Sequence, residues 1–177
     1  MKPMNLTEKI FAAHLVGGGE LPPAGEVVTI RIDEAFTQDA TGTMAMLQLE
    51  AMGVKRVKPL SVNFVDHSMM QSGFRNPDDH EYLRTVSQKL GIIFSPPGAG
   101  ICHFLNIENF VKPGMTGIGA DSHTVNAGGM GAICITSMGR MTRMGPMETT
   151  RVVPRPRIKR RSQDWLASGV NLICTVV

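Results

Sequence analysis

The chain has 177 residues, of which 42% are hydrophobic and 19% are charged, and its formal net charge is +3. This size fits one domain with a single core, and no apolar run approaches the roughly 20 residues that a membrane-spanning helix needs. The N-terminal segment also lacks the pattern of a secretory signal, so we expect a cytoplasmic protein with no membrane partner.

The chain begins with helix-like and strand-like segments in alternation. Asn5 or Thr7 can cap a first helix that runs through Leu15, and an apolar, strand-like segment follows at 27–32. A second helix is expected at 41–52, ended by a glycine in the left-handed conformation.

The same alternation continues through the middle of the chain. The expected elements are a strand at 61–65, a helix opened by Asp78 and Asp79 and ending near Gly91, a strand at 91–94, a helix after a Pro/Gly loop, and a strand at 115–120. Apolar strands that alternate with helices predict an α/β layered architecture.

Charge and periodicity both change after Ile135. Residues 1–136 hold 10 basic and 13 acidic side chains, whereas residues 137–177 hold 8 and 2. The second segment contains three prolines and has no sustained helical or strand period. We therefore divide the chain into a domain at 1–136 and a poorly ordered, basic tail at 137–177, in which only 165–177 is apolar enough for one short element.

Ionisable side chains follow the apolar strands in the motifs TQDATGT, NFVDHSMMQ and GIGADSHTVNAGGMG. Open α/β sheets bind their ligands outside the carboxyl ends of the strands. In the second motif, the carboxylate of Asp66 can orient the imidazole of His67 and stabilise its protonated form, which would make His67 an acid. The alternative is that Asp66 caps the following helix and His67 is an ordinary surface residue.

The third motif places Asp121, Ser122 and His123 before the glycine-rich AGGMG, which we expect to open another helix. Backbone N–H groups at such a helix start suit a carboxylate or a phosphate. The glycines can equally serve only a tight turn. His103, expected in the first turns of the fourth helix, is a further candidate because it too lies beside a glycine-rich loop.

Four motifs in the same order resemble the aconitase family of iron-sulfur hydro-lyases. They are TQDATGTMAMLQLEAMG, VDHSMMQSGF, PPGAGICHFLNIENFVKPG and GADSHTVNAGGMGAICI. TQDATG and the run after DSHT are more similar to aconitase than to isopropylmalate isomerase. The resemblance implies that residues 1–136 are the N-terminal part of an aconitase-like, three-layer α/β/α domain.

The resemblance also implies the roles of individual side chains. The implied catalytic residues are Asp66, His67, His103, Asp121 and His123. The implied substrate-binding residues are Gln38 and Ser122. In this family an Asp–His pair protonates the hydroxyl that leaves as water from a citrate-like tricarboxylic acid, and Asp66 with His67 matches that pair. His103 with Asp121 matches a second pair.

The implied cofactor is a [4Fe-4S] cluster whose one iron without a cysteine ligand acts as a Lewis acid. Family members place the three cluster cysteines and the catalytic serine base beyond the part that this chain matches. Cys102, Cys134 and Cys174 lie outside the cluster-binding segments, so we assign no metal ligand and expect buried thiols. We therefore expect an incomplete hydro-lyase that is inactive alone, either a fragment or a subunit whose partner chain supplies the cluster and the base.

Two other functions fit parts of the sequence. A non-catalytic, truncated product could bind polyanions through the basic residues Arg151, Arg155, Arg157, Lys159, Arg160 and Arg161. No stacking aromatics are interleaved with them, so a solvated tail is the simpler interpretation and nucleic acid is not an expected partner. A mononuclear metal hydrolase could use the five implied catalytic residues as ligands, but the order of the motifs favours the hydro-lyase.

Overall fold

The computed structural model describes residues 3–136 and 173–176. A five-stranded parallel sheet lies at its centre, with the strand order β4-β3-β2-β5-β6. The strands are β2 (Glu34–Gln38), β3 (Leu60–Phe64), β4 (Ile93–Ser95), β5 (Thr116–Gly119) and β6 (Ile133–Thr136). Parallel neighbours place the carboxyl ends of all five strands at one edge of the sheet.

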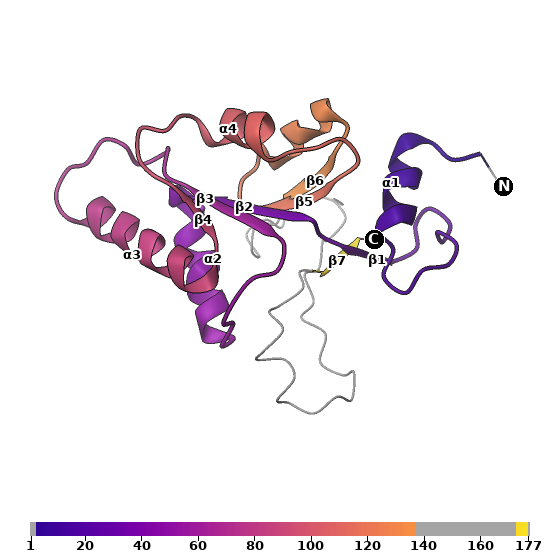
Figure 1. The fold of residues 1–177 in the computed structure, drawn as a ribbon, viewed down its shortest axis with the longest axis horizontal. Helices are drawn as coiled ribbons and strands as arrows, with labels where there is room; N and C mark the ends of the chain where they lie inside the picture. The colour runs from indigo at the N-terminus through magenta and orange to yellow at the C-terminus, as the bar shows by residue number, and fades with distance from the viewer. Residues whose placement is uncertain (1–2, 137–172, 177) are drawn as a thin grey trace.

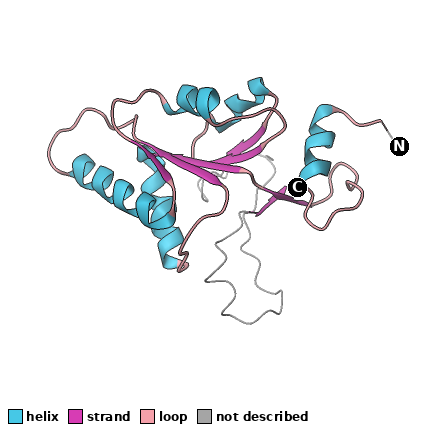
Figure 2. Ribbon diagram, viewed as in Figure 1, coloured by secondary structure: helices cyan, strands magenta, loops and turns pink. Residues whose placement is uncertain are grey.

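Helices cover both faces of this sheet (Figure 1). One face carries α2 (Asp39–Ala51) and α3 (Arg75–Leu90), and the other carries α4 (Cys102–Asn109) and the 3-10 helix η1 (Thr124–Met130) (Figure 2). The chain moves outward from β2 through β3 to β4, then crosses back to β5 and β6. Right-handed connections in opposite directions put their helices on opposite faces. The predicted three-layer α/β/α arrangement is thus confirmed.

A smaller unit lies beside the sheet (Figure 1). It contains α1 (Leu6–His14), β1 (Val28–Arg31) and β7 (Ile173–Val176), and β7 pairs with β1 in the antiparallel sense. Asn5 caps α1, since its side chain accepts the N–H of Glu8 while the Glu8 carboxylate accepts the N–H of Asn5. β7 is the short element expected within 165–177, and residues 137–172 lie outside the described part of the chain.

Two apolar layers hold the helices to the sheet. Between α2, α3 and the sheet, the buried side chains include Met46, Leu83 and Leu90. Under α4, Phe36 and Phe64 pack edge to face, with ring centroids 6.1 Å apart. No helix in the described ranges is long and apolar enough to cross a lipid bilayer.

Three predicted helix starts are wrong in detail. The second helix begins at Asp39, two residues early, because the side chain of Gln38 accepts the N–H of Ala40 and caps it. The third begins at Arg75 rather than at Asp78, because Pro77 falls in the first turn, where the missing N–H has no helical partner to lose. The AGGMG glycines lie within and at the end of η1 and do not open a helix.

Candidate active site at the carboxyl ends of the strands

The predicted site residues meet at the edge of the sheet where the strands end. Gln38 is the last residue of β2, and Asp66 and His67 lie just beyond β3. Asp121 follows β5, and His103 comes from the first turn of α4. The chain connections reverse direction between the neighbouring strands β2 and β5, which is the point where open α/β sheets bind ligands. Residues up to 83 positions apart in the chain are hydrogen-bonded there.

Asp66 and His67 form a pair that is tied to α4. His67 Nδ1 lies 2.8 Å from Asp66 Oδ1, and the other oxygen of Asp66 accepts the N–H of Cys102 at 2.6 Å. Asp66 therefore does cap a helix, but this helix is α4 and not the one that follows it in the chain. The Asp66 side chain is 7% exposed and that of His67 is 38% exposed, so the imidazole alone faces solvent.

Asp121 is the carboxylate at the centre of the site. His103 Nε2 lies 3.1 Å from it and His67 Nε2 lies 3.9 Å away, while the Gln38 amide donates to it at 3.3 Å. Burial would raise the pKa of Asp121, but hydrogen bonds from the His123 N–H and the Gln38 amide, with the charges of His103 and His123, bring that pKa below its ordinary value. The carboxylate is therefore charged at neutral pH.

The structure places Gln38 behind Asp121. Gln38 is 2% exposed, its amide nitrogen donates to Asp121, and its amide oxygen accepts the N–H of Ala40. In this arrangement Gln38 orients a carboxylate of the site. Its predicted contact with a substrate stays a prediction.

Ser122 and His123 form the exposed side of the site. The His123 side chain is 76% exposed, and its Nδ1 lies 3.3 Å from the hydroxyl of Ser122. Its ring packs edge to face on that of His103, with centroids 5.5 Å apart. The N–H groups of His123 and Thr124 are bound by Asp121, so they are not free to hold the anion expected at this turn.

Asp39 is a further residue of the site that we did not predict from the sequence. Its carboxylate accepts the backbone N–H groups of Asp66, His67 and Ser68 at 3.0, 2.9 and 2.7 Å, and it lies 3.1 Å from the Nε2 of His80. Burial alone would raise the pKa of Asp39, but these hydrogen bonds lower it to about 2. Asp39 directly follows Gln38 in the TQDATGT motif, and an aspartate at a strand end was the signal that could have revealed it.

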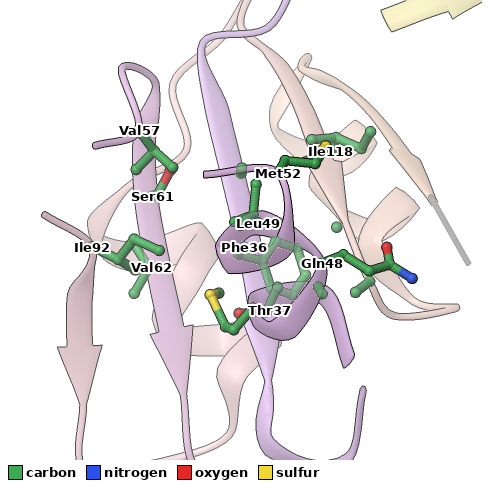
Figure 3. Close-up of a pocket in the computed structure, with 15 residues that line it drawn as sticks. Phe36, Thr37, Gln48, Leu49, Met52, Val57, Ser61, Val62, Ile92 and Ile118 are labelled. Atoms are coloured by element: carbon green, nitrogen blue, oxygen red, sulfur yellow. The ribbon is translucent and has the colours of Figure 1, made fainter. Parts of the chain in front are cut away.

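A hydrophobic pocket lies away from these polar groups, between α2 and the sheet (Figure 3). Leu49 of α2 and Met52, which directly follows that helix, line the pocket together with Phe36, Val62 and Ile118 of three strands. None of the predicted site residues lines it, and neither does any ionisable side chain. It therefore offers no acid–base chemistry.

Two groups of side chains in the described residues could hold a metal ion. The donor atoms of His103, Asp121 and His123 lie within 4.8 Å of one another, and so do those of Asp66, His67 and Cys102. Burial, followed by the charges of Asp66 and Asp121, raises the pKa of the Cys102 thiol well above its ordinary value. Cys102 is therefore a neutral thiol, which is a poor metal ligand.

Cys134 is buried as well. Burial and the charge of Glu34 raise the pKa of its thiol to about 12. The prediction of buried thiols is confirmed for Cys102 and Cys134, whereas the side chain of Cys174 is outside the described part.

Comparisons with known proteins agree with the motifs. The profile of the aconitase family (aconitate hydratase) matches residues 8–149. The chain is 34% identical over 149 residues to a mitochondrial aconitate hydratase of Gracilaria gracilis, covering 78% of the chain and 19% of that protein. It is 38% identical over 135 residues to large subunit 1 of the 3-isopropylmalate dehydratase of Thermotoga maritima, covering 76% and 31%.

A third relative is the mitochondrial homocitrate dehydratase of Saccharomyces cerevisiae, which is 35% identical over 152 residues, covering 75% of the chain and 19% of that protein. The chain thus spans about a fifth to a third of the length of these curated relatives. The names of these three relatives refer to different substrates, although the chain is similarly identical in sequence to each of them.

Proposed function

Because the chain belongs to the aconitase family, we propose that its described residues form the proton-donating side of a hydro-lyase site for a citrate-like hydroxy acid. The observation that carries the proposal is the convergence of two histidines, from the loop after β3 and from α4, on the single buried carboxylate of Asp121. The proposed substrate is a small tricarboxylic acid, as the names of the aconitate hydratase and the homocitrate dehydratase suggest, whereas isopropylmalate, named in the remaining relative, has two carboxylates.

His67 is the proposed acid. Its Nδ1 lies 2.8 Å from Asp66, so an N–H there donates to the carboxylate, and the second proton of a protonated ring is then carried by Nε2. When the C–O bond of the substrate breaks, this proton goes to the departing hydroxyl, which leaves as water. A positioned general acid accelerates such a step by roughly 10²- to 10⁴-fold.

Asp121, His103 and His123 complete the proposed site. The charged Asp121 holds His103 in place at 3.1 Å, and the exposed His123 and Ser122 offer donors to the substrate's hydroxyl and carboxylates. Hydrogen-bond donors aimed at the position of a developing charge stabilise the transition state.

The family's [4Fe-4S] cluster supplies a Lewis acid when it is bound. Cys102 and Cys134 do not fit as its ligands, since both are buried and their thiol pKa values are raised. In this proposal the cluster ligands and the base that removes the substrate's C–H proton come from outside the described residues, on a partner chain. The steps assigned above use only this chain's own side chains.

A metal hydrolase is the second candidate, because the donor atoms of His103, Asp121 and His123 lie within 4.8 Å of one another. Two histidines and one carboxylate are a common ligand set for zinc and iron. Metal analysis of aerobically purified protein separates the two functions. One zinc per chain supports the hydrolase. The polyanion-binding alternative concerns Arg151 to Arg161, which lie outside the described residues.

The test is anaerobic reconstitution with iron and sulfide, followed by the ultraviolet assay for aconitate formed from citrate or isocitrate, with and without a candidate partner chain. We expect activity only with the partner. Activity of the chain alone would show that the base and the cluster site are within it, and inactivity in both cases would favour a non-catalytic product.

A point variant then tests the acid. Replacing His67 with asparagine should lower kcat by roughly 10²- to 10⁴-fold. The matched control is His14→Asn, because His14 also pairs with a carboxylate, that of Asp33 at 2.6 Å, but before the amino end of β2. If the two variants retain the same activity, His67 is not the acid.

A further inference from the structure

We propose that Asp39, together with His80, is a positioning unit that sets the backbone of residues 66–68 and thereby aims His67 at Asp121. The role in catalysis rests on the function proposed above. The placement of the loop can be tested without it.

Four donors converge on the buried carboxylate of Asp39. Oδ1 accepts the N–H groups of Asp66 and His67 at 3.0 and 2.9 Å. Oδ2 accepts the N–H of Ser68 at 2.7 Å and lies 3.1 Å from the Nε2 of His80. The Asp39 side chain is 1% exposed, so water does not compete with these bonds. Hydrogen bonds to an ionised acceptor are about twice as strong as neutral ones.

Apart from the bond that the Asp66 carboxylate accepts from the N–H of Cys102, the loop has little else that defines its path. Residues 67–74 form neither a helix nor a strand, and Met70 and Phe74 are 92% and 76% exposed, so no buried apolar side chain anchors that stretch at those positions. Three successive N–H groups that point at one carboxylate determine how the peptide planes of 66–68 are turned. The direction of the His67 side chain follows from them, and a misplacement of 1 Å can cost roughly 10²-fold in rate.

His80 ties the far part of the same loop to Asp39. It lies on α3, its side chain is 8% exposed, and its Nδ1 is 3.0 Å from the amide nitrogen of Gln71. With that nitrogen as the donor, Nδ1 accepts and Nε2 carries the hydrogen that goes to Asp39. Residues 66–68 and residue 71 are therefore held by one Asp–His pair that bridges α2 and α3.

A second Asp–His pair in the chain provides a control. Asp33 accepts the N–H of Thr116 at 3.1 Å and lies 2.6 Å from the Nε2 of His14, so it combines a backbone donor and an imidazole as Asp39 does. It precedes β2, whereas Asp39 follows that strand. Asp33→Asn should therefore perturb folding in a similar way without touching the loop.

The experiment is residue-resolved amide hydrogen exchange on the full chain carrying Asp39→Asn, Asp33→Asn or no change. We expect Asp39→Asn to raise the exchange rates of the amides of residues 66–68 by about tenfold or more while those of β3 stay unchanged. Asp33→Asn should leave residues 66–68 as in the unchanged chain. Equal rates at 66–68 in Asp39→Asn and the unchanged chain would overturn the proposal.

Two His80 variants distinguish the loss of this hydrogen bond from general unfolding of the chain. His80→Gln keeps an N–H donor and should retain protection at 66–68, whereas His80→Leu removes the donor and should lose it. Equal exchange in both would overturn the role of His80. In the partner-supplemented assay, Asp39→Asn should lower kcat by about 10²-fold with little change in KM. The two proposals can fail separately. If hydrogen exchange changes as expected but the unchanged chain is inactive in the partner-supplemented assay, the positioning role is supported and only the hydro-lyase function is overturned.

Discussion

Replacing Glu34 with glutamine should stabilise the protein at alkaline pH. Glu34 begins β2, at the opposite end of the strand from the site, and is 1% exposed. Burial raises its pKa from 4.5 to about 7, although a hydrogen bond from Asn106 opposes this. Its Oε1 has no hydrogen-bond partner among the described residues, so the charged form is poorly compensated.

The sign and size of this stability change follow from the pKa values of Glu34 in the unfolded and the folded state. Because the pKa of Glu34 is higher in the folded state, its contribution to stability is complete below pH 4.5 and is lost as the pH rises through 7. Each pH unit between the two values corresponds to about 1.4 kcal/mol, which sets an upper limit of about 3 kcal/mol and an expected gain of about 2 kcal/mol for Glu34→Gln at pH 8. At pH 4.5 the gain should be close to zero.

Urea unfolding at the two pH values, followed by circular dichroism, measures this difference. The control is Glu81→Gln, since Glu81 lies exposed on α3 beside Arg84 and its pKa is lowered by that partner. The control should keep the pH dependence of the unchanged chain. A stability difference for Glu34→Gln that is the same at both pH values would refute the reasoning, because it could not arise from the ionisation of a buried carboxyl.

Two further predictions concern the strand that leads to the site and the cysteines. Gly119→Ala should lower the free energy of unfolding by about 1–3 kcal/mol in urea titrations, because the new Cβ would overlap the side chain of Thr124. Gly128→Ala, with no atom within 4 Å of its Cβ position, should cost less, and an equal loss would contradict the packing argument. Cys102 and Cys134 should resist iodoacetamide in the native protein and react after unfolding, as judged by peptide mass spectrometry.

Local sequence rules predicted which helices and strands form better than they predicted the residues at which these elements begin and end. Asn5 caps α1, and Gly91 ends α3 in the left-handed conformation, since both signals act within a few residues of the chain. The start of α2 was predicted two residues late, because the cap is supplied by Gln38, a residue that also belongs to the preceding strand. A residue such as Gln38, which ends a strand and also caps the next helix, is assigned poorly by hydrophobic periodicity.

For the site too, local sequence predicted the candidate residues but not the contacts between them. Ionisable residues after apolar strands, in a fixed order of motifs, gave from the sequence alone the candidate site residues and the family that they resemble. Contacts between residues far apart in the chain could not be read from spacing. The capping of α4 by Asp66 crosses 36 positions, and the bond from Gln38 to Asp121 crosses 83.

The sequence by itself determined the α/β class and the helix-ending glycines, because these depend on residue type and local order. The candidate acid pairs came from its resemblance to the family. Only the tertiary structure decided that Asp121 stands at the centre of the site, that Gln38 lies behind it, and that Asp39 holds the loop of His67. Parallel strands bring their carboxyl ends together, and which side chains then meet depends on strand order and on the turn of each loop.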